Sequence, residues 1–124
     1  MHYVAVFIGG GIGAALRHGV NRAAMTWLGI GFPYGTLFVN VVGGLMMGIL
    51  AEMFSAKGGG TQEFRLFLTT GLLGGFTTFS AFSLESALLW KRGEMLDLGA
   101  FMLGNVVLSI AALFLGIAIV RAAS

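Results

Sequence analysis

The stretch TTGLLGGFTTFSAFS, residues 69–83, decides the fold of this chain. It lies inside a segment from about Glu63 to Trp90 that is apolar enough to span a bilayer, which takes about 20 residues. A Gly pair followed by Thr-Thr makes a poor continuous helix, because Gly costs about 1 kcal/mol against Ala in a helix interior and Thr is β-branched. The sequence therefore predicts a helix that is broken between about Gly74 and Thr78.

A break in mid-membrane predicts a binding site. Lipid offers no partner for the freed backbone groups, so protein, water or ions must satisfy them. Carbonyl groups at the end of the first half-helix suit a cation, and amides at the start of the second suit an anion. The alternative is a continuous helix with a close-packed Gly face and Thr hydroxyls bonded to its own backbone. Gly-Gly together with Thr-Thr and Ser favours the break.

The rest of the composition is that of an all-α membrane protein. Of the 124 residues, 57% are hydrophobic and 10% are charged, and a soluble chain this short could not bury so much apolar surface. Because the links between apolar segments are short, we expect residues 1–124 to form a single transmembrane domain of four helices. The expected spans run from about Tyr3 to Trp27, Gly35 to Phe54, Glu63 to Trp90 and Leu98 to Val120.

The sequence carries no pattern typical of an enzyme or of a nucleic-acid-binding protein. Cysteine is absent, His2 and His18 lack metal-ligand spacing, and no Ser/His/acid set is visible. The glycines of residues 9–13 have no βαβ pattern around them, so they are not a dinucleotide fingerprint. Seven basic residues are too few for a nucleic-acid surface.

The basic residues favour neither orientation in the membrane. An even number of spans puts both termini on one side, and the cytoplasmic side normally carries an excess of Lys and Arg. Three basic residues fall on one side and three or four on the other, so a chain could insert both ways and pair with its own inverted copy. The alternative is a weak bias that the rule does not resolve. The two sets are Lys57, Arg65 and Arg121 against Arg22, Lys91 and Arg92, with Arg17 deeper in its helix.

Two phenylalanines after the expected break are candidates for contact with an anion. Phe79 and Phe82 are three residues apart and share a helical face. Their ring edges carry positive partial charge, which an anion can approach without meeting a fixed charge. The alternative is ordinary packing. The neighbouring hydroxyls of Ser80 and Ser83 favour the functional interpretation.

Polar residues also mark the second and fourth spans. Asn40 lies one turn before Gly44, and a buried amide is costly unless it is paired. It can join two helices or donate to an ion, and both interpretations stay open. On the fourth span Phe101, Asn105 and Ser109 recur every four residues, which predicts a donor track on one stripe.

Glu85 is the one acidic residue deep in an expected span. Intramembrane ionisable residues face a cavity or a partner and are candidates for function. Glu85 could hold a proton or gate a route for ions. The alternative is a structural ion pair with a basic side chain such as Arg17 or Arg22.

At these residues the chain resembles the fluoride channel family known as Fluc or CrcB. The resemblance covers nearly the whole chain and rests on three motifs. They are GGIGAALR at residues 10–17, GTLFVN at residues 35–40 and GGFTTFSAFS at residues 74–83. The third motif is highly specific, and together the three leave little room for another family.

The resemblance implies a fluoride-selective ion channel that exports fluoride from the cytoplasm across the cell inner membrane and so reduces its toxicity. It implies an antiparallel, dual-topology homodimer with two pores and a broken third helix. A structural sodium ion at the dimer centre would be held by the backbone carbonyls of Gly74 and Thr77. The implied fluoride pore comprises Asn40, Thr78, Phe79, Ser80, Phe82, Ser83, Glu85, Asn105 and Ser109, with Arg17 at a vestibule.

The fourth span departs from the family pattern at two positions. Phe101 stands where relatives often carry Tyr, and Asn105 where several carry Ser or His. Two other functions stay open: a proton-coupled small-anion transporter working through Glu85, and a membrane scaffold subunit that transports nothing. Without the resemblance the residues do not choose fluoride over another small anion.

Overall fold

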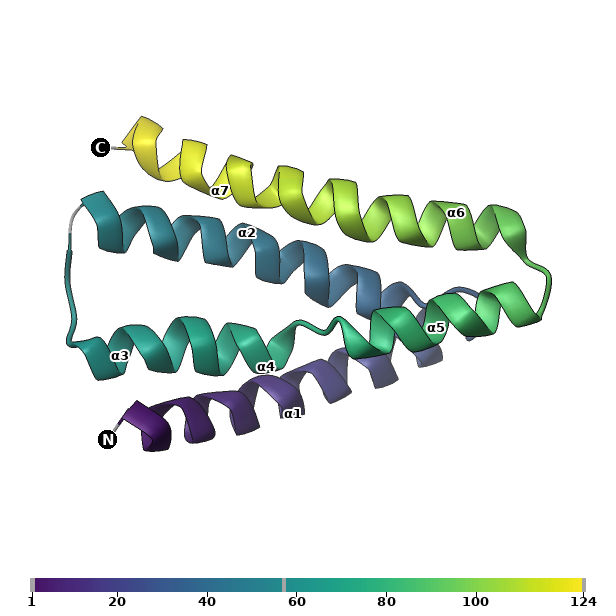
Figure 1. Cartoon of the computed structure of the whole chain (residues 1–124), viewed down its shortest axis with the longest axis horizontal. Helices are drawn as coiled ribbons and strands as arrows, with labels where there is room; N and C mark the ends of the chain where they lie inside the picture. Colours follow the sequence, from purple (N-terminus) through teal and green to yellow (C-terminus); the bar gives the residue numbers. More distant parts are fainter. Residues whose placement is uncertain (1, 57, 124) are drawn as a thin grey trace.

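The computed structural model describes residues 2–56 and 58–123. They form four long helical segments that run back and forth (Figure 1). Lys57, which belongs to one of the two basic sets above, lies outside the described residues. The first two segments are α1 (His2–Leu28) and α2 (Tyr34–Ala56). The third consists of α3 (Gln62–Leu66), η1 (Phe67–Leu73), α4 (Gly74–Phe76) and α5 (Ser80–Lys91), and the fourth of α6 (Met95–Leu103), η2 (Gly104–Leu108) and α7 (Ser109–Ala123).

The prediction of four membrane-spanning segments is confirmed. The segments hold 27, 23, 30 and 29 residues, and by length and composition each is apolar enough to cross a membrane. Many large apolar side chains along them point outwards, among them Phe7, Leu96 and Phe114. Such a surface suits lipid rather than water. The chain is therefore an all-α, multi-pass membrane protein.

Glycines let the helices approach closely. α2 lies beside α7, and α1 lies beside η1 and α4 (Figure 1). A Cβ atom added to Gly44 of α2 would lie 2.6 Å from the carbonyl oxygen of Ser109, and one added to Gly9 of α1 would lie 2.5 Å from that of Phe67. Because any side chain at these positions would push the helices apart, Gly44 serves the tight packing that its spacing predicts.

Two wide turns interrupt the α-helical geometry of the third and fourth segments. η1 and η2 are π-helical, with i→i+5 hydrogen bonds, and such turns appear frequently at functional sites. η2 contains Asn105, which is buried. The small buried core lies near one end of the bundle, where Phe82, Leu89 and Phe101 pack together.

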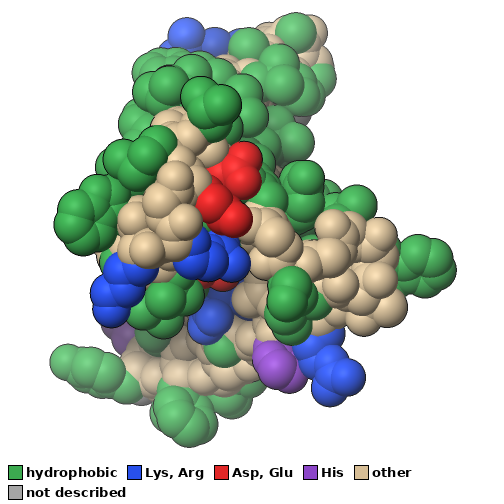
Figure 2. Space-filling view, turned by 90° about the vertical axis from the view of Figure 1, so that its right-hand side faces the viewer, with side chains coloured by type: hydrophobic (Ala, Val, Ile, Leu, Met, Phe, Trp, Pro, Cys, Tyr) green, Lys and Arg blue, Asp and Glu red, His purple; other side chains and the backbone are tan. Residues whose placement is uncertain are grey.

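The two ends of the bundle carry the ion pairs. The start of α1 and the end of α7 lie at one end (Figure 1), where Arg121 pairs with Glu52 at 3.1 Å. At the opposite end Arg92 pairs with Glu94 at 3.4 Å. Figure 2 shows that end, with basic and acidic side chains grouped within a largely hydrophobic surface.

Candidate functional site

The third segment is interrupted at residues 77–79, between α4 and α5 (Figure 1). Thr77 has an extended backbone, with φ −87° and ψ 164°. Its N–H and its hydroxyl both donate to the carbonyl of Leu73, each at 3.0 Å. The glycine pair itself remains helical, and the chain leaves the helix after Phe76, inside the range from about Gly74 to Thr78 that the sequence indicates.

The side chain of Asn40 in α2 forms hydrogen bonds with the backbone N–H and carbonyl of Thr78, which lie outside any helix. Its Oδ1 accepts the N–H of Thr78 at 2.9 Å, and its Nδ2 donates to the carbonyl of Thr78 at 3.1 Å. The same Nδ2 donates to Oδ1 of Asn105 at 2.8 Å. Buried backbone groups must be paired, and here one side-chain amide pairs both groups of one residue. Asn40 thus makes interhelical hydrogen bonds, as the first of its two interpretations predicted.

Two carbonyl groups at the interruption have lost their usual helical donors. The N–H of Thr78, which would bond the Gly74 carbonyl in a continuous helix, donates to Asn40 instead. The N–H of Ala81, which would bond the Thr77 carbonyl, donates to the hydroxyl of Thr78 at 3.1 Å. Neutral oxygens suit hard cations. The carbonyls of Gly74 and Thr77 therefore fit the sodium site that the resemblance implies.

The start of α5 offers hydrogen-bond donors. Within the described part of the chain, no hydrogen bond is donated by the backbone N–H of Phe79 or Ser80. Oγ1 of Thr78 lies 3.4 Å from Oγ of Ser80. The start of a helix carries partial positive charge, which favours anions. The hydroxyl of Ser83, by contrast, donates to the carbonyl of Phe79 at 3.0 Å and is occupied within α5.

A groove of about 410 Å³ lies beside the interruption. The hydroxyl oxygen of Ser109 is buried in its wall and has no hydrogen-bond partner among the described residues. The wall carries polar groups but no charged side chain. It is lined by Asn40, Gly43, Gly44, Met47, Leu73, Thr77, Thr78, Phe79, Phe82, Asn105, Val106, Ser109, Ile110 and Leu113.

A row of aromatic rings leads inwards from this groove. The centroids of Phe79 and Phe82 are 5.4 Å apart and the rings are tilted by 49°. Phe82 also lies 5.3 Å from Phe101, which meets Phe32 edge-on at 5.7 Å. Phe82 is 8% exposed whereas Phe79 is 77% exposed. Phe82 is therefore fixed by packing, while the ring of Phe79 is open to whatever covers the groove.

Glu85 has a neutral partner. The hydroxyl of Thr36, which is 1% exposed, donates to Oε1 of Glu85. Among the ion pairs of the described residues none includes Glu85. Arg17 instead donates from Nε to the carbonyl of Gly75 at 3.1 Å. The alternative that Glu85 is held by Arg17 or Arg22 is therefore wrong.

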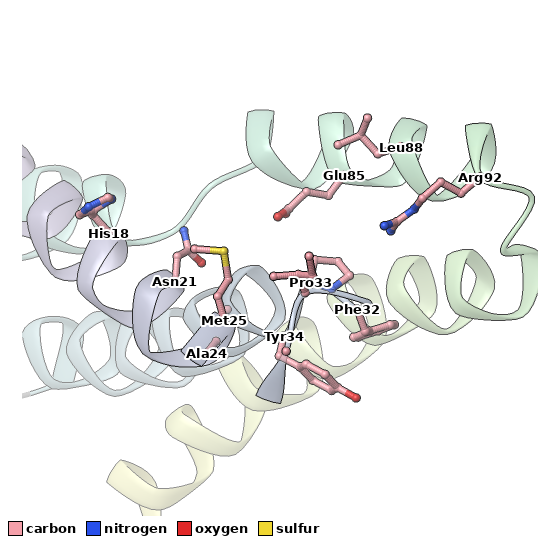
Figure 3. Close-up of a pocket in the computed structure, with 13 residues that line it drawn as sticks. His18, Asn21, Ala24, Met25, Phe32, Pro33, Tyr34, Glu85, Leu88 and Arg92 are labelled. Atoms are coloured by element: carbon pink, nitrogen blue, oxygen red, sulfur yellow. The ribbon is translucent and has the colours of Figure 1, made fainter. Parts of the chain in front are cut away.

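Glu85 faces a second hollow, of about 460 Å³, which shares no lining residue with the groove. Figure 3 shows Glu85 of α5 and Arg92, which directly follows α5, extending into this hollow, with Asn21 of α1 and Pro33 of the turn between α1 and α2 across from them. Arg17 lines neither space, and its contact lies at the end of α4.

The structure divides the expected site residues into groups. One group lines the groove: Asn40, Thr77, Thr78, Phe79, Phe82, Asn105 and Ser109. Gly74, Ser80 and Ser83 lie in the same segment of chain but not in the groove wall, and Glu85 lies at the second hollow. Sequence reasoning missed Thr36. Its position four residues before Asn40, on the same helical face, was a signal that could have found it.

These features define a class: a polytopic helical membrane protein with an uncharged polar groove beside an interrupted helix. A sequence model of the family described as CrcB-like protein, Camphor Resistance (CrcB), matches residues 4–117. The chain therefore belongs to the CrcB family.

Curated relatives match it over nearly their full length. The fluoride-specific ion channel FluC of Rhodopseudomonas palustris is 53% identical over 122 residues, which are 98% of each chain. The fluoride-specific ion channel FluC 2 of Nitrobacter hamburgensis is 48% identical over 121 residues, again 98% of each chain. FluC of Granulibacter bethesdensis is 50% identical over 121 residues, 98% of this chain and 95% of that protein.

Proposed function

We propose that this chain is a fluoride-selective ion channel of the cell inner membrane that lets fluoride leave the cytoplasm and so reduces its toxicity. The relatives named as fluoride-specific channels are about half identical to it and match it from end to end. The observation that carries the proposal at atomic level is the groove beside the interruption, whose wall has polar groups and aromatic rings but no charge.

The chemistry of the groove suits a small, strongly hydrated anion. A selective pore must replace the water around such an ion with close donors. A fixed Lys or Arg would hold fluoride too tightly to release it, whereas neutral donors bind it weakly. The unpartnered hydroxyl of Ser109 and the ring edge of the buried Phe82 are groups of this kind.

The interrupted third helix is the feature that organises these groups. At the start of α5 lie the free N–H groups of Phe79 and Ser80 and the hydroxyl of Thr78, which are close together in the chain. Asn40 holds the backbone of Thr78 in position and borders the groove. Ser83 follows in α5, and its hydroxyl would have to release its bond to the carbonyl of Phe79 before it could donate to an anion.

The working unit in this proposal is an antiparallel, dual-topology homodimer. The exposed ring of Phe79 and the open groove give a second copy a surface to cover. The balanced basic residues allow the two copies to insert in opposite senses. The carbonyls of Gly74 and Thr77 of both copies would hold one sodium ion, which would neutralise their dipoles at the interface.

Fluoride efflux from liposomes that contain only the purified chain tests the function. A fluoride electrode records release driven by a potassium gradient with valinomycin, and a chloride electrode provides the selectivity control. A channel gives fast fluoride release that needs no opposing proton gradient and leaves chloride inside. Release that stops without a proton gradient would support the proton-coupled transporter working through Glu85. No release at all would support a scaffold subunit and end the proposal.

A further inference from the structure

Asn105 is one link in a hydrogen-bond chain that joins the second, third and fourth segments. It lies in η2 and is 6% exposed. Its Nδ2 donates to the carbonyl of Phe101 at 2.8 Å, and its Oδ1 accepts from Nδ2 of Asn40 at 2.8 Å. Asn40 then exchanges two hydrogen bonds with the backbone of Thr78.

Only one arrangement of donors and acceptors is possible along this series of hydrogen bonds. A carbonyl cannot donate, so the NH₂ group of Asn105 must face Phe101 and its oxygen must face Asn40. That oxygen requires a donor, so the NH₂ group of Asn40 faces it, and Oδ1 of Asn40 is left for the N–H of Thr78. If either amide turned over, oxygen would meet oxygen at one contact and N–H would meet N–H at another.

Phe101, at which this series of hydrogen bonds ends, is held rigidly by packing. The side chain of Phe101 is fully buried, with its ring packed between those of Phe82 and Phe32. Its carbonyl lies in the turn where α6 passes into η2, and wide π-helical turns of this kind occur often at functional sites. The carbonyl of Phe101 therefore holds Asn105 from a fixed point.

We propose that Asn105 is a positioning residue, which sets the orientation of the Asn40 amide and through it the backbone of Thr78 at the interruption. It differs in this from Ser109, its neighbour on the expected donor track, whose hydroxyl has no partner. The Asn105 oxygen that borders Asn40 would repel an anion, and one of its donors is bound to Phe101. Its influence on an ion is therefore indirect. The effect on flux rests on the proposed function, whereas the effect on Thr78 does not.

Hydrogen exchange of the Thr78 amide, measured by NMR on the full chain in detergent without fluoride, tests the positioning role. Asn105→Leu keeps a similar volume and removes both polar contacts, so Thr78 should exchange about five- to tenfold faster, the factor for one ordinary hydrogen bond. Asn105→Ser keeps a hydroxyl that can donate to Phe101 and accept from Asn40, so exchange should stay close to wild type. The same change at another asparagine, Asn21→Leu, is the matched control and should leave Thr78 unchanged.

A double-mutant comparison separates an indirect role from a direct one. In an Asn40→Ala background, Asn105→Leu should not accelerate Thr78 exchange further, because the link that carries its effect is gone. Equal exchange in wild type and Asn105→Leu, or the same acceleration in both backgrounds, would overturn the proposal. Should Asn105→Leu not fold, Asn105→Ala, which also removes both polar contacts, decides: exchange as slow as in wild type would refute the positioning role.

Fluoride efflux from liposomes provides the second readout. Asn105→Leu should slow efflux by a factor similar to its effect on Thr78 exchange, and Asn105→Ser should recover most of it. If wild-type protein passes no fluoride, the proposed function fails while Thr78 exchange still decides the role of Asn105. If Asn105→Leu changes Thr78 exchange but leaves efflux at the wild-type rate, the orientation of Asn40 does not control conduction, and that part of the proposal is wrong.

Discussion

Replacing Asn40 by Asp exchanges one NH₂ group for an oxygen and keeps the shape of the side chain. The carboxylate can still accept the N–H of Thr78, which lies 2.9 Å from Oδ1 in the wild type. The donations to the Thr78 carbonyl at 3.1 Å and to Asn105 Oδ1 at 2.8 Å both become contacts between two oxygens. The change thus removes two of the three hydrogen bonds that Asn40 makes.

The size of the effect follows from the number of acceptors left without a donor. Each buried acceptor that loses its partner costs about 1–3 kcal/mol, so two cost about 2–6 kcal/mol. An Asp that takes up a proton regains one donor, which lowers the cost to about 1–3 kcal/mol. We expect loss of conduction in both cases: an ionised Asp adds a negative charge to the groove wall, and a protonated one leaves Thr78 held less firmly.

Two measurements check this prediction: fluoride efflux from liposomes, and the free energy of unfolding in detergent. Gln62→Glu is the control, because it makes the same amide-to-acid change at an exposed position at the start of α3. It should leave both quantities unchanged. Wild-type efflux together with wild-type stability in Asn40→Asp would refute the reasoning, because the donations of Asn40 would then be needed for neither folding nor conduction.

Further predictions concern the rings, the free hydroxyl and the orientation of the chain. Phe82→Ile and Phe79→Ile should keep the dimer and greatly slow fluoride efflux, because bulk is preserved and the ring edge is lost. Phe114→Ile, at an exposed ring that does not line the groove, is the control. Wild-type efflux in both variants would mean that the two rings serve packing alone. Ser109→Ala should slow efflux without lowering stability by more than about 0.5 kcal/mol, since the hydroxyl has no partner to lose; a larger loss measured by unfolding would contradict this. Two or three lysines added after Ser124 should fix that end in the cytoplasm and abolish export in cells, and export should return when a copy locked the other way is co-expressed. Full export by the locked chain alone would exclude the antiparallel dimer.

The four spans could be predicted from the sequence because their signal is local. Each is a run of apolar residues longer than the bilayer requires, and no expected end differs from the observed one by more than three residues. The fourth span shows the limit: α6 begins at Met95 rather than at Leu98, because the carbonyl of Gly93 and the N–H of Met95 form a turn that composition does not reveal.

The exact position of the interruption could not be predicted locally, because it depends on a residue far away in the sequence. The sequence predicts the break between about Gly74 and Thr78, from Gly-Gly and Thr-Thr together, and the structure has the interruption at residues 77–79. A Cβ at Gly75 would lie 3.0 Å from Cα of Gly10, so Gly75 serves close packing against α1 and stays helical. The helix ends later because Asn40, 38 residues away in sequence, pairs with Thr78. Such a partner cannot be read from local propensity.

The residues predicted for one site divide between two spaces in the structure. Asn40 and Ser109 line one groove, while Glu85 lies at a different hollow with Thr36 as its partner. Spacing along one helix indicates which residues share a face. It does not tell which face of a neighbouring helix they meet, and the wide turn η2 changes the spacing itself.

Fluoride current across a planar bilayer that contains only the purified chain tests the central claim most directly. With different fluoride concentrations on the two sides and an independent pH difference, the account predicts a current that reverses at the fluoride equilibrium potential. It also predicts that changing the pH difference leaves this reversal unmoved and that chloride carries almost none of the current. Absence of a fluoride current, or a reversal potential that follows the proton gradient, would contradict the account.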